Sequence, residues 1–347
     1  MKKHYIIPFF IPHEGCPFTC IFCSQNKISG KKVSLPPSKI AFCIHEKLKT
    51  IPIKNTFVEV AFFGGSFTGL DKNIQLKYLE SVRPFLGKGR INGIRVSTRP
   101  DYIDKSILNL LKAHGVKRIE LGVQSMSDIV LKKIKRGHTF SDVKQASKLI
   151  LKNGFELGHQ IMVGLPGSNQ KDEIRTAQKS IQMGVSEVRI YPILVIKGTR
   201  LASMWEKGEF VAITESVAIA RCAKLIKLFE NSSVRIIRLG LHPSEDLLSG
   251  SEILAGPFHV AFRQKCETFI YGIIFKTFFA KEKNRLCLKQ IFYNPIDTAY
   301  VIGYQRANAY YVEKIMNTKN IFKPSNTIQP KTVKIEFRDR KSVVLKK

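Results

Sequence analysis

The chain has 347 residues, enough for one large domain or two ordinary ones, and its 44% hydrophobic and 24% charged residues exclude a disordered or fibrous protein. Its 57 Lys and Arg residues exceed its 27 Asp and Glu residues and give a net charge of +30. This charge favours a polyanionic partner such as nucleic acid, although a generally lysine-rich composition would explain it as well.

The amino-terminal segment begins with an apolar run at residues 5–12, which contains two prolines and is followed by His13 and Glu14. The run is too short for a secretion signal, and no stretch approaches the roughly 20 apolar residues of a membrane helix. The 7 cysteines are too few for a disulfide scaffold in a chain of this length. We therefore expect a cytoplasmic protein without a membrane segment.

Strand-like and helix-like segments then alternate along the chain. Apolar, β-branched runs predict strands at residues 5–11, 57–63, 93–97, 118–123, 155–163 and 187–195. Segments with helical periodicity predict helices near residues 38–50, 72–86, 103–113, 127–136, 140–153, 170–183 and 211–230. Nearly continuous apolar strands separated by helices are typical of a parallel sheet that helices cover. The alternation fits an α/β barrel or an open, doubly wound sheet.

Polar or glycine residues follow almost every predicted strand and favour the barrel. They occur at residues 64–66, 97–99, 124–125 and 164–166. In a barrel all strand carboxyl ends meet at one mouth, whereas an open sheet brings only two or three together. We therefore expect a partial (β/α)6 TIM-like barrel over residues 1–235. A small C-terminal α+β domain should follow over residues 236–347, with strands at 269–275 and 333–337 and a helix at 304–317.

Three cysteines, Cys16, Cys20 and Cys23, follow the first predicted strand in the pattern CxxxCxxC. Three thiolates so close in sequence predict a site for a soft metal. Zinc would need a fourth ligand, for which His13 is the nearest candidate. A 4Fe–4S cluster on three cysteines would leave one iron open. Three buried thiols without a metal are the remaining alternative, and buried thiols are the expectation for the unclustered Cys43, Cys222, Cys266 and Cys287.

The cysteine loop resembles that of the radical S-adenosylmethionine superfamily, and Gly64-Gly65-Ser66 after the second strand is similar to the glycine motif of that superfamily. The resemblance implies that Cys16, Cys20 and Cys23 hold a 4Fe–4S cluster whose open iron binds S-adenosylmethionine. It also implies an external electron donor of the flavodoxin or ferredoxin type, whose electron leads to a 5′-deoxyadenosyl radical.

By motif position, the resemblance implies a pocket for S-adenosylmethionine. Its residues would be Phe22, Gly64, Gly65, Ser66, Ser97, Gln124, Arg136 and Gln160. Phe22 would shield the cluster, and the Arg136 fork would suit the carboxylate of the cofactor. Alternatively, Arg136 lies at a solvated helix end beside several lysines, and the two glutamines are hydrogen-bonded amides of the barrel interior.

Four further segments, residues 97–102, 120–125, 136–139 and 191–199, resemble the radical domain of the Elongator catalytic subunit and its stand-alone bacterial relatives. This similarity extends over roughly residues 5–240 and implies action on the wobble uridine of tRNA. The chain departs from Elongator because it ends where the acetyltransferase domain would begin, so no acetyl-coenzyme A site is implied. Its cysteine spacing is the common superfamily form, and Ser97 replaces a Glu.

The favoured function is therefore a radical enzyme that acts on RNA, with tRNA as the main candidate. A small molecule such as a tetrapyrrole, as in a coproporphyrinogen oxidase-like enzyme, is the alternative substrate. A non-catalytic iron–sulfur protein that binds RNA or senses redox state is the alternative class. Arg235 and Arg238 are expected to face phosphates or a substrate carboxylate at the barrel mouth, unless they are scattered surface charges. Tyr191 and His138 are weaker candidates for contacts with the substrate.

Overall fold

The computed structural model describes residues 3–11, 14–17, 20–25, 27, 34–87, 90–241, 245–281, 288–339 and 341–347, so His13 and Cys287 lie outside the described residues. The chain forms two compact units. The first comprises Met1–Thr214 and Leu228–Phe258, and the second comprises Glu215–Lys227 and His259–Lys347. Across the described segments, none of the helices has the length and apolar character needed to cross a membrane.

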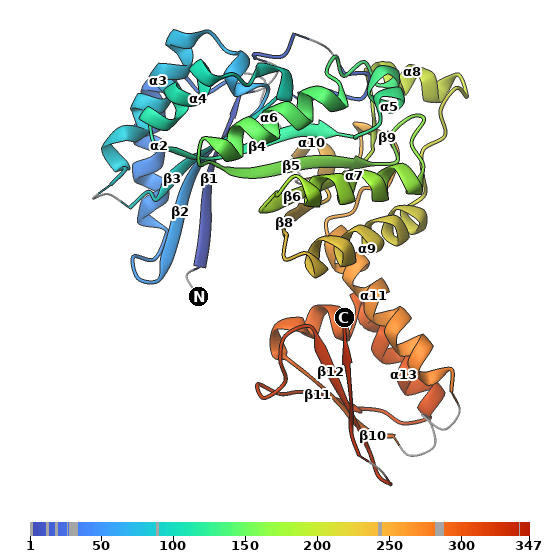
Figure 1. The fold of residues 1–347 in the computed structure, drawn as a ribbon. Helices are drawn as coiled ribbons and strands as arrows, with labels where there is room; N and C mark the ends of the chain where they lie inside the picture. The colour runs from blue at the N-terminus through green and yellow to red at the C-terminus, as the bar shows by residue number, and fades with distance from the viewer. Residues whose placement is uncertain are drawn as a thin grey trace. The chain divides into compact units, whose positions relative to one another are not determined.

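The first unit is built around a seven-stranded parallel sheet with the strand order β1-β2-β3-β4-β5-β6-β8 (Figure 1). Its strands are β1 (Lys3–Ile11), β2 (Thr56–Gly64), β3 (Gly93–Thr98), β4 (Val116–Gln124), β5 (Glu156–Val163), β6 (Glu187–Pro192) and β8 (Arg235–Leu239). The predicted partial TIM-like barrel is confirmed, with one strand more than the six expected. The sequence signal for β8 is weak because two arginines interrupt its short apolar run.

Helices connect successive strands, as the alternating sequence pattern predicts. They are α2 (Pro37–Lys49), α3 (Lys72–Val82), α4 (Lys105–Ala113), α5 (Asp128–Lys133), α6 (Phe140–Lys152), α7 (Gln170–Gln182) and α9 (Glu215–Asn231). Most outward side chains of the strands are apolar; Phe62 of β2, for example, packs on α3, with its ring centroid 5.4 Å from that of Tyr78. His159 of β5 is an exception and is buried between Ser147 of α6 and Ser180 of α7. After β6 the chain forms β7 (Val195–Ile196) and α8 (Arg200–Glu206). Beyond β8 it forms α10 (Glu245–Leu248) and β9 (Ile253–Ala255), which pairs with β7.

The inward side chains of the strands differ from the apolar pattern that we expected, because they form a buried ionic network. Arg95 of β3 is fully buried and donates to three carboxylates, those of Glu59 at 2.8 Å, Glu120 at 2.6 Å and Glu187 at 2.8 Å. Arg118 of β4 donates to Glu59 at 2.6 Å. We call these five residues the ionic layer. It fills the barrel interior toward the amino ends of the strands and leaves the opposite end for a cavity.

Electrostatics within the ionic layer favour its charged forms. Burial alone would raise the pKa of Glu59, but a hydrogen bond from His4 and the charges of Arg95 and Arg118 outweigh it and lower that pKa to about 2. Burial likewise opposes ionisation of Glu120, while the Arg189 and Arg95 guanidiniums hold its pKa below the usual range. Each buried charge is thus compensated by partners from other strands.

The second unit, described by itself, contains a four-stranded sheet with the order β11-β10-β12-β13. Its strands are β11 (Phe322–Pro324), β10 (Leu288–Tyr293), β12 (Thr332–Phe337) and β13 (Val343–Lys346), and its longer helices are α11 (Phe262–Phe279) and α13 (Ala307–Met316). A short helix, α12 (Thr298–Val301), precedes α13. The predicted strand at 333–337 and helix at 304–317 are confirmed.

The predicted strand at residues 269–275 is wrong, because this segment lies in the middle of α11. A short apolar run fits either a strand or a buried helix, and periodicity alone cannot separate the two. Here the side chains of Tyr271, Phe275 and Phe279 are buried against the sheet of the same unit. The burial of a broad apolar face therefore determines the helix.

Candidate active site

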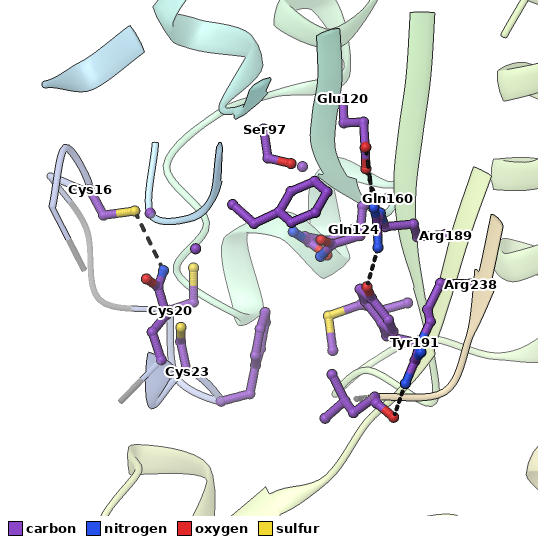
Figure 2. A pocket seen from close by; sticks show the side chains of 18 of the residues that line it. Cys16, Cys20, Cys23, Ser97, Glu120, Gln124, Gln160, Arg189, Tyr191 and Arg238 are labelled. Carbon is purple, nitrogen blue, oxygen red and sulfur yellow. Dashed lines mark hydrogen bonds and ion pairs between the residues drawn. The ribbon is translucent and has the colours of Figure 1, made fainter. Parts of the chain in front are cut away.

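A cavity of about 720 Å³ opens at the carboxyl ends of the parallel strands in the first unit. Figure 2 shows the three cysteine side chains on one side of it and Arg189, Tyr191 and Arg238 on the other. Most of the site residues expected from the sequence line it. These are Cys16, Cys20, Phe22, Cys23, Gly64, Gly65, Ser97, Gln124, Arg136 and Gln160. The fold thus brings together residues from the cysteine loop, from the carboxyl ends of β2, β3, β4 and β5, and from the segment after α5.

The cysteine loop is anchored to the body of the unit through Ile21. The Ile21 amide donates to the Ile134 carbonyl at the end of α5 at 3.2 Å, and its carbonyl accepts from the Leu201 amide of α8 at 2.7 Å. Cys20, Ile21 and Phe22 are all buried. The thiols are therefore presented to the cavity from an anchored backbone, although residues 14–17 and 20–24 of the loop form no helix or strand.

The two glycines after β2 are required by the close approach of the cysteine loop. A Cβ atom on Gly65 would lie 2.0 Å from the Glu14 carbonyl oxygen, and one on Gly64 would lie 2.8 Å from that of Ile11. Gly64 also has a φ of 110°, which side chains disfavour. The glycine motif thus lets the second strand end pack against the segment that carries Cys16.

Ser66 does not line the cavity, in contrast to the expectation from the sequence. Its side chain is fully buried, and its Oγ lies 2.8 Å from Thr98 Oγ1. Ser66 Oγ also accepts a hydrogen bond from the Arg99 amide at 3.3 Å. Ser66 therefore joins the glycine motif to the end of β3 and leaves the adjacent Gly64 and Gly65 backbone facing the cavity.

The thiols have few partners among the described residues and are unfavourable as bare thiolates. Cys20 Sγ accepts from Arg136 Nη1 at 3.5 Å, and Cys16 Sγ accepts from Gln25 Nε2 at 3.9 Å. Burial raises the pKa of Cys16, and burial with the neighbouring thiols raises that of Cys23 to about 12. A cationic ligand at these thiols would favour their ionised form, which burial opposes at Cys16 and Cys23.

The thiol geometry also bears on which metal group would fit. Among the described residues, no three His, Cys, Asp or Glu side chains are placed to hold a metal ion. A single zinc ion requires sulfur atoms at about 2.3 Å from one point. A four-iron cluster contacts each thiolate through a different iron, so its sulfurs stand further apart. The donor set, three thiols that face one cavity, is of the kind that would hold an iron–sulfur cluster.

Arg136 is buried and faces the cavity, which excludes the solvated helix end. Lys135 adopts a φ of 53° after α5, and this left-handed turn directs Arg136 inward. Arg136 Nη2 donates to the Gly122 carbonyl at 2.8 Å. A Cβ atom on Gly122 would lie only 2.7 Å from Arg136 Nη2. Arg136 Nε is buried without a partner. The guanidinium is thus presented to the cavity beside Cys20.

Two glutamine side chains form the floor of the cavity beside Arg136. Gln160 Nε2 of β5 donates to Gln124 Oε1 of β4 at 3.1 Å. Gln124 has a φ of 66°, in a region that residues other than glycine seldom adopt. The strand register also shifts between Gly122 and Gln124. Strained backbone of this kind is common at binding sites and here turns the Gln124 side chain into the cavity.

The opposite wall contains charged residues that the sequence analysis missed. Arg189 of β6 pairs with Glu120 of β4, lies 4.4 Å above the Phe63 ring, and donates from Nη1 to the Tyr191 hydroxyl at 3.4 Å. All four residues line the cavity. The signal for them in the sequence is a charged residue at every second position of an otherwise apolar strand, as in Glu187 and Arg189.

Two other candidates lie away from the cavity. Arg235 contacts Glu187 at 2.7 Å and His4 at 3.2 Å, which places it at the amino ends of the strands rather than at the mouth. His138 is buried behind the cavity wall and does not line it. Burial and the charges of Arg136 and Arg99 lower the pKa of His138 to about 3. Arg235 therefore contacts the ionic layer through Glu187, and His138 packs behind the cavity wall.

Two protein-family models match consecutive parts of the chain. The model of the radical SAM superfamily matches residues 10–179, and the model of the radical SAM C-terminal domain matches residues 185–269. Among curated proteins, an uncharacterized protein of Methanocaldococcus jannaschii is 30% identical over 59% of this chain and 66% of its own length. The tRNA uridine(34) acetyltransferase of Methanocaldococcus infernus is 37% identical over 50% of this chain and 36% of its own length.

Among solved structures, the archaeal Elp3 of Methanocaldococcus infernus with an N-terminal deletion has the same fold. It aligns with a TM-score of 0.61 at 22% identity, over 80% of this chain and 64% of that one. The chain thus spans less than two thirds of the length of most of these relatives. Together with the cysteine loop at the mouth of a parallel partial barrel, these matches show that the chain belongs to the radical S-adenosylmethionine superfamily of enzymes.

Proposed function

We propose that this protein is a radical enzyme that modifies RNA, with tRNA as its substrate. The observation that carries the proposal is the single cavity in which three cysteines, two glutamines and the Arg136 guanidinium meet at the carboxyl ends of parallel strands. Active sites of barrel enzymes are built at this end. The first unit, which continues past the expected boundary at residue 235 to Phe258, contains the whole cavity.

Each group of cavity residues has a separate role in this proposal. Cys16, Cys20 and Cys23 would hold the 4Fe–4S cluster, which together with S-adenosylmethionine would supply a 5′-deoxyadenosyl radical when bound. Arg136 offers a buried cationic fork for a carboxylate, and Gln124 and Gln160 offer amide groups for hydroxyl or amino groups. Three reduced thiols and a low-potential electron donor of the flavodoxin or ferredoxin type require a reducing compartment, the cytoplasm.

The choice of RNA rests on two independent observations. Relatives of this chain are named for tRNA uridine acetylation, and the net charge of +30 suits a polyanion. A folded tRNA cannot enter a cavity of about 720 Å³, so the target nucleotide would have to be extruded into it. The cavity size equally suits a small anionic molecule, which is the second candidate substrate.

The proposal is tested by cleavage of S-adenosylmethionine without substrate. The anaerobically reconstituted, reduced protein should release 5′-deoxyadenosine, because the cofactor site needs no substrate group. Cys20→Ala should release none. If the wild-type protein contains a complete cluster and still releases no 5′-deoxyadenosine, the chain is a non-catalytic iron–sulfur protein instead. If 5′-deoxyadenosine is released, nucleoside mass spectrometry of tRNA from a deletion strain would identify the modified base.

Arg136→Ala should weaken S-adenosylmethionine binding by about 2–4 kcal/mol, the cost of leaving a partly buried carboxylate without its charged partner. Equilibrium binding to the reconstituted protein measures this loss. Lys132→Ala, which removes an exposed cation from the adjacent helix, is the matched control and should bind as the wild type does. Normal affinity of the Arg136 variant would assign the cofactor carboxylate to another residue.

Binding of tRNA should depend strongly on salt. Each neutralised phosphate contributes close to −0.9 to the slope of log affinity against log salt concentration, so about five contacts would give a slope near −4. Gel-shift titrations from low to physiological salt measure the slope. The control is an unrelated protein of equal net charge. Affinity no better than that of the control would rule out RNA and favour the small-molecule substrate.

A further inference from the structure

Arg238 differs from the other arginines on the inner face of the sheet. Arg95, Arg118, Arg189 and Arg235 each contact at least one carboxylate. Arg238 Nε and Nη2 instead donate to the main-chain carbonyls of Gly240 at 3.1 Å and Leu241 at 3.0 Å. Within the described part of the chain, these carbonyls are its only hydrogen-bond partners, and they leave Nη1 available. The side chain lines the cavity (Figure 2).

Among the described residues, no carboxylate pairs with Arg238. Burial lowers the pKa of its guanidinium; the Tyr191 hydroxyl opposes this effect, and the nearby Arg189 cation adds to it. The carboxylate of Glu120 already accepts hydrogen bonds from Arg95 and Arg189, and it makes none with Arg238. A cation held half-buried beside another cation is favourable only when an anion comes close to it. The wall formed by β6 and β8 therefore lacks one negative charge.

Tyr191 adds a second donor to the same wall. Its hydroxyl oxygen accepts from Arg189 Nη1, so its own proton remains to be donated. Around these polar groups the cavity is lined by apolar side chains, including Phe10, Ile237 and Leu241. The wall thus combines a fixed guanidinium, a hydroxyl donor and an apolar surface, on the side of the cavity opposite the cysteines.

We propose that Arg238 and Tyr191 form a subsite for an oxyanion of the substrate, and that this oxyanion is the phosphate of an extruded nucleotide. The proposal rests on the proposed RNA function. The fork of Arg238, held by two carbonyls, would bind the phosphate oxygens, and Tyr191 would donate to the same group. The apolar lining would contact the base or ribose. The nucleotide would be held across the cavity from the cysteine side, with its sugar or base toward Arg136 and the glutamines.

The test compares two probes that differ only by the 5′-phosphate group, uridine 5′-monophosphate and uridine, by calorimetry on the reconstituted protein. The wild type should bind the monophosphate at least about tenfold more tightly, the gain typical of charge-assisted hydrogen bonds. Arg238→Met should reduce this preference to less than about twofold. Arg238→Lys keeps the charge without the fork and should retain part of it. Arg175→Met removes an exposed arginine from α7 and should leave it unchanged.

The outcomes separate the subsite from the proposed function. Equal affinity of the wild type for both probes, or an unchanged preference in Arg238→Met, overturns the subsite. If the Met variant does not fold, an unchanged preference in Arg238→Lys overturns it. Glutarate is the third probe. If it binds more tightly than the monophosphate, and the Arg238 variants lose this binding, the subsite is for a small carboxylate and the assignment to a phosphate is wrong. Absence of S-adenosylmethionine cleavage in a wild type that prefers the monophosphate would reject the radical function alone.

Discussion

Replacement of any one of Cys16, Cys20 and Cys23 by Ala should abolish the iron–sulfur absorbance of the reconstituted protein, which should otherwise contain about four irons per chain. The three thiols line one wall of the cavity, and burial raises the pKa of Cys16 and Cys23. Among the described residues, no other cysteine lines the cavity and could replace a lost ligand. Iron analysis and visible absorbance after anaerobic reconstitution measure the effect.

Cys43→Ala is the control for this loss, because Cys43 is a free thiol of α2 that does not line the cavity. Its iron content should equal that of the wild type. Cys222 and Cys266, both fully buried, and Cys287 should be equally dispensable for the cluster. A requirement for any of these four would mean that the cluster has a fourth protein ligand. The iron needed to bind S-adenosylmethionine would then not be open.

Arg95→Met should destabilise the first unit by about 3–5 kcal/mol, the usual cost of removing one partner from a buried ionic group. The methionine fills a similar volume, but Glu59, Glu120 and Glu187 would lose the cation that all three contact. Three buried carboxylates would then face one another with too little positive charge nearby. Urea unfolding followed by circular dichroism measures the change in the free energy of unfolding.

Arg83→Met provides the comparison for the Arg95 variant, because Arg83 is an exposed arginine in the same unit. Its effect should stay within about 0.5 kcal/mol, as for most surface substitutions. A loss below about 1 kcal/mol for Arg95→Met would mean that the carboxylates take up protons or water instead. The ionic layer would then contribute little to the stability of the barrel.

The sequence was sufficient for six of the seven barrel strands, for the helices between them and for most of the cavity. The cysteine spacing, the glycine pair after β2 and the polar residues at the strand ends are local patterns, and parallel topology brings strand ends together. The ionic layer was not predicted, because mean hydropathy hides a charged residue that recurs at alternate positions. Which arginine meets which glutamate depends on strand register, and no local pattern encodes register.

Ser66 shows why a motif position does not define a contact. It follows two glycines whose backbone faces the cavity, yet its own side chain turns to Thr98. At Arg136 the motif position was correct. Three exposed lysines around it had left a solvated helix end as the alternative. One left-handed residue, Lys135, reverses the direction of the chain there. Side-chain direction at such turns follows from tertiary packing rather than from composition.

The ionic layer also restricts how the strands can assemble. If β3 or β4 slipped by one residue against its neighbour, every side chain on it would change face. Arg95 or Glu120 would then lie among the apolar side chains under the helices, and Ile94 or Ile119 would enter the charged interior. Both errors are costly, and they occur together. The glutamates and arginines therefore penalise mispaired intermediates, so the layer should narrow the set of folding routes as well as stabilise the finished barrel.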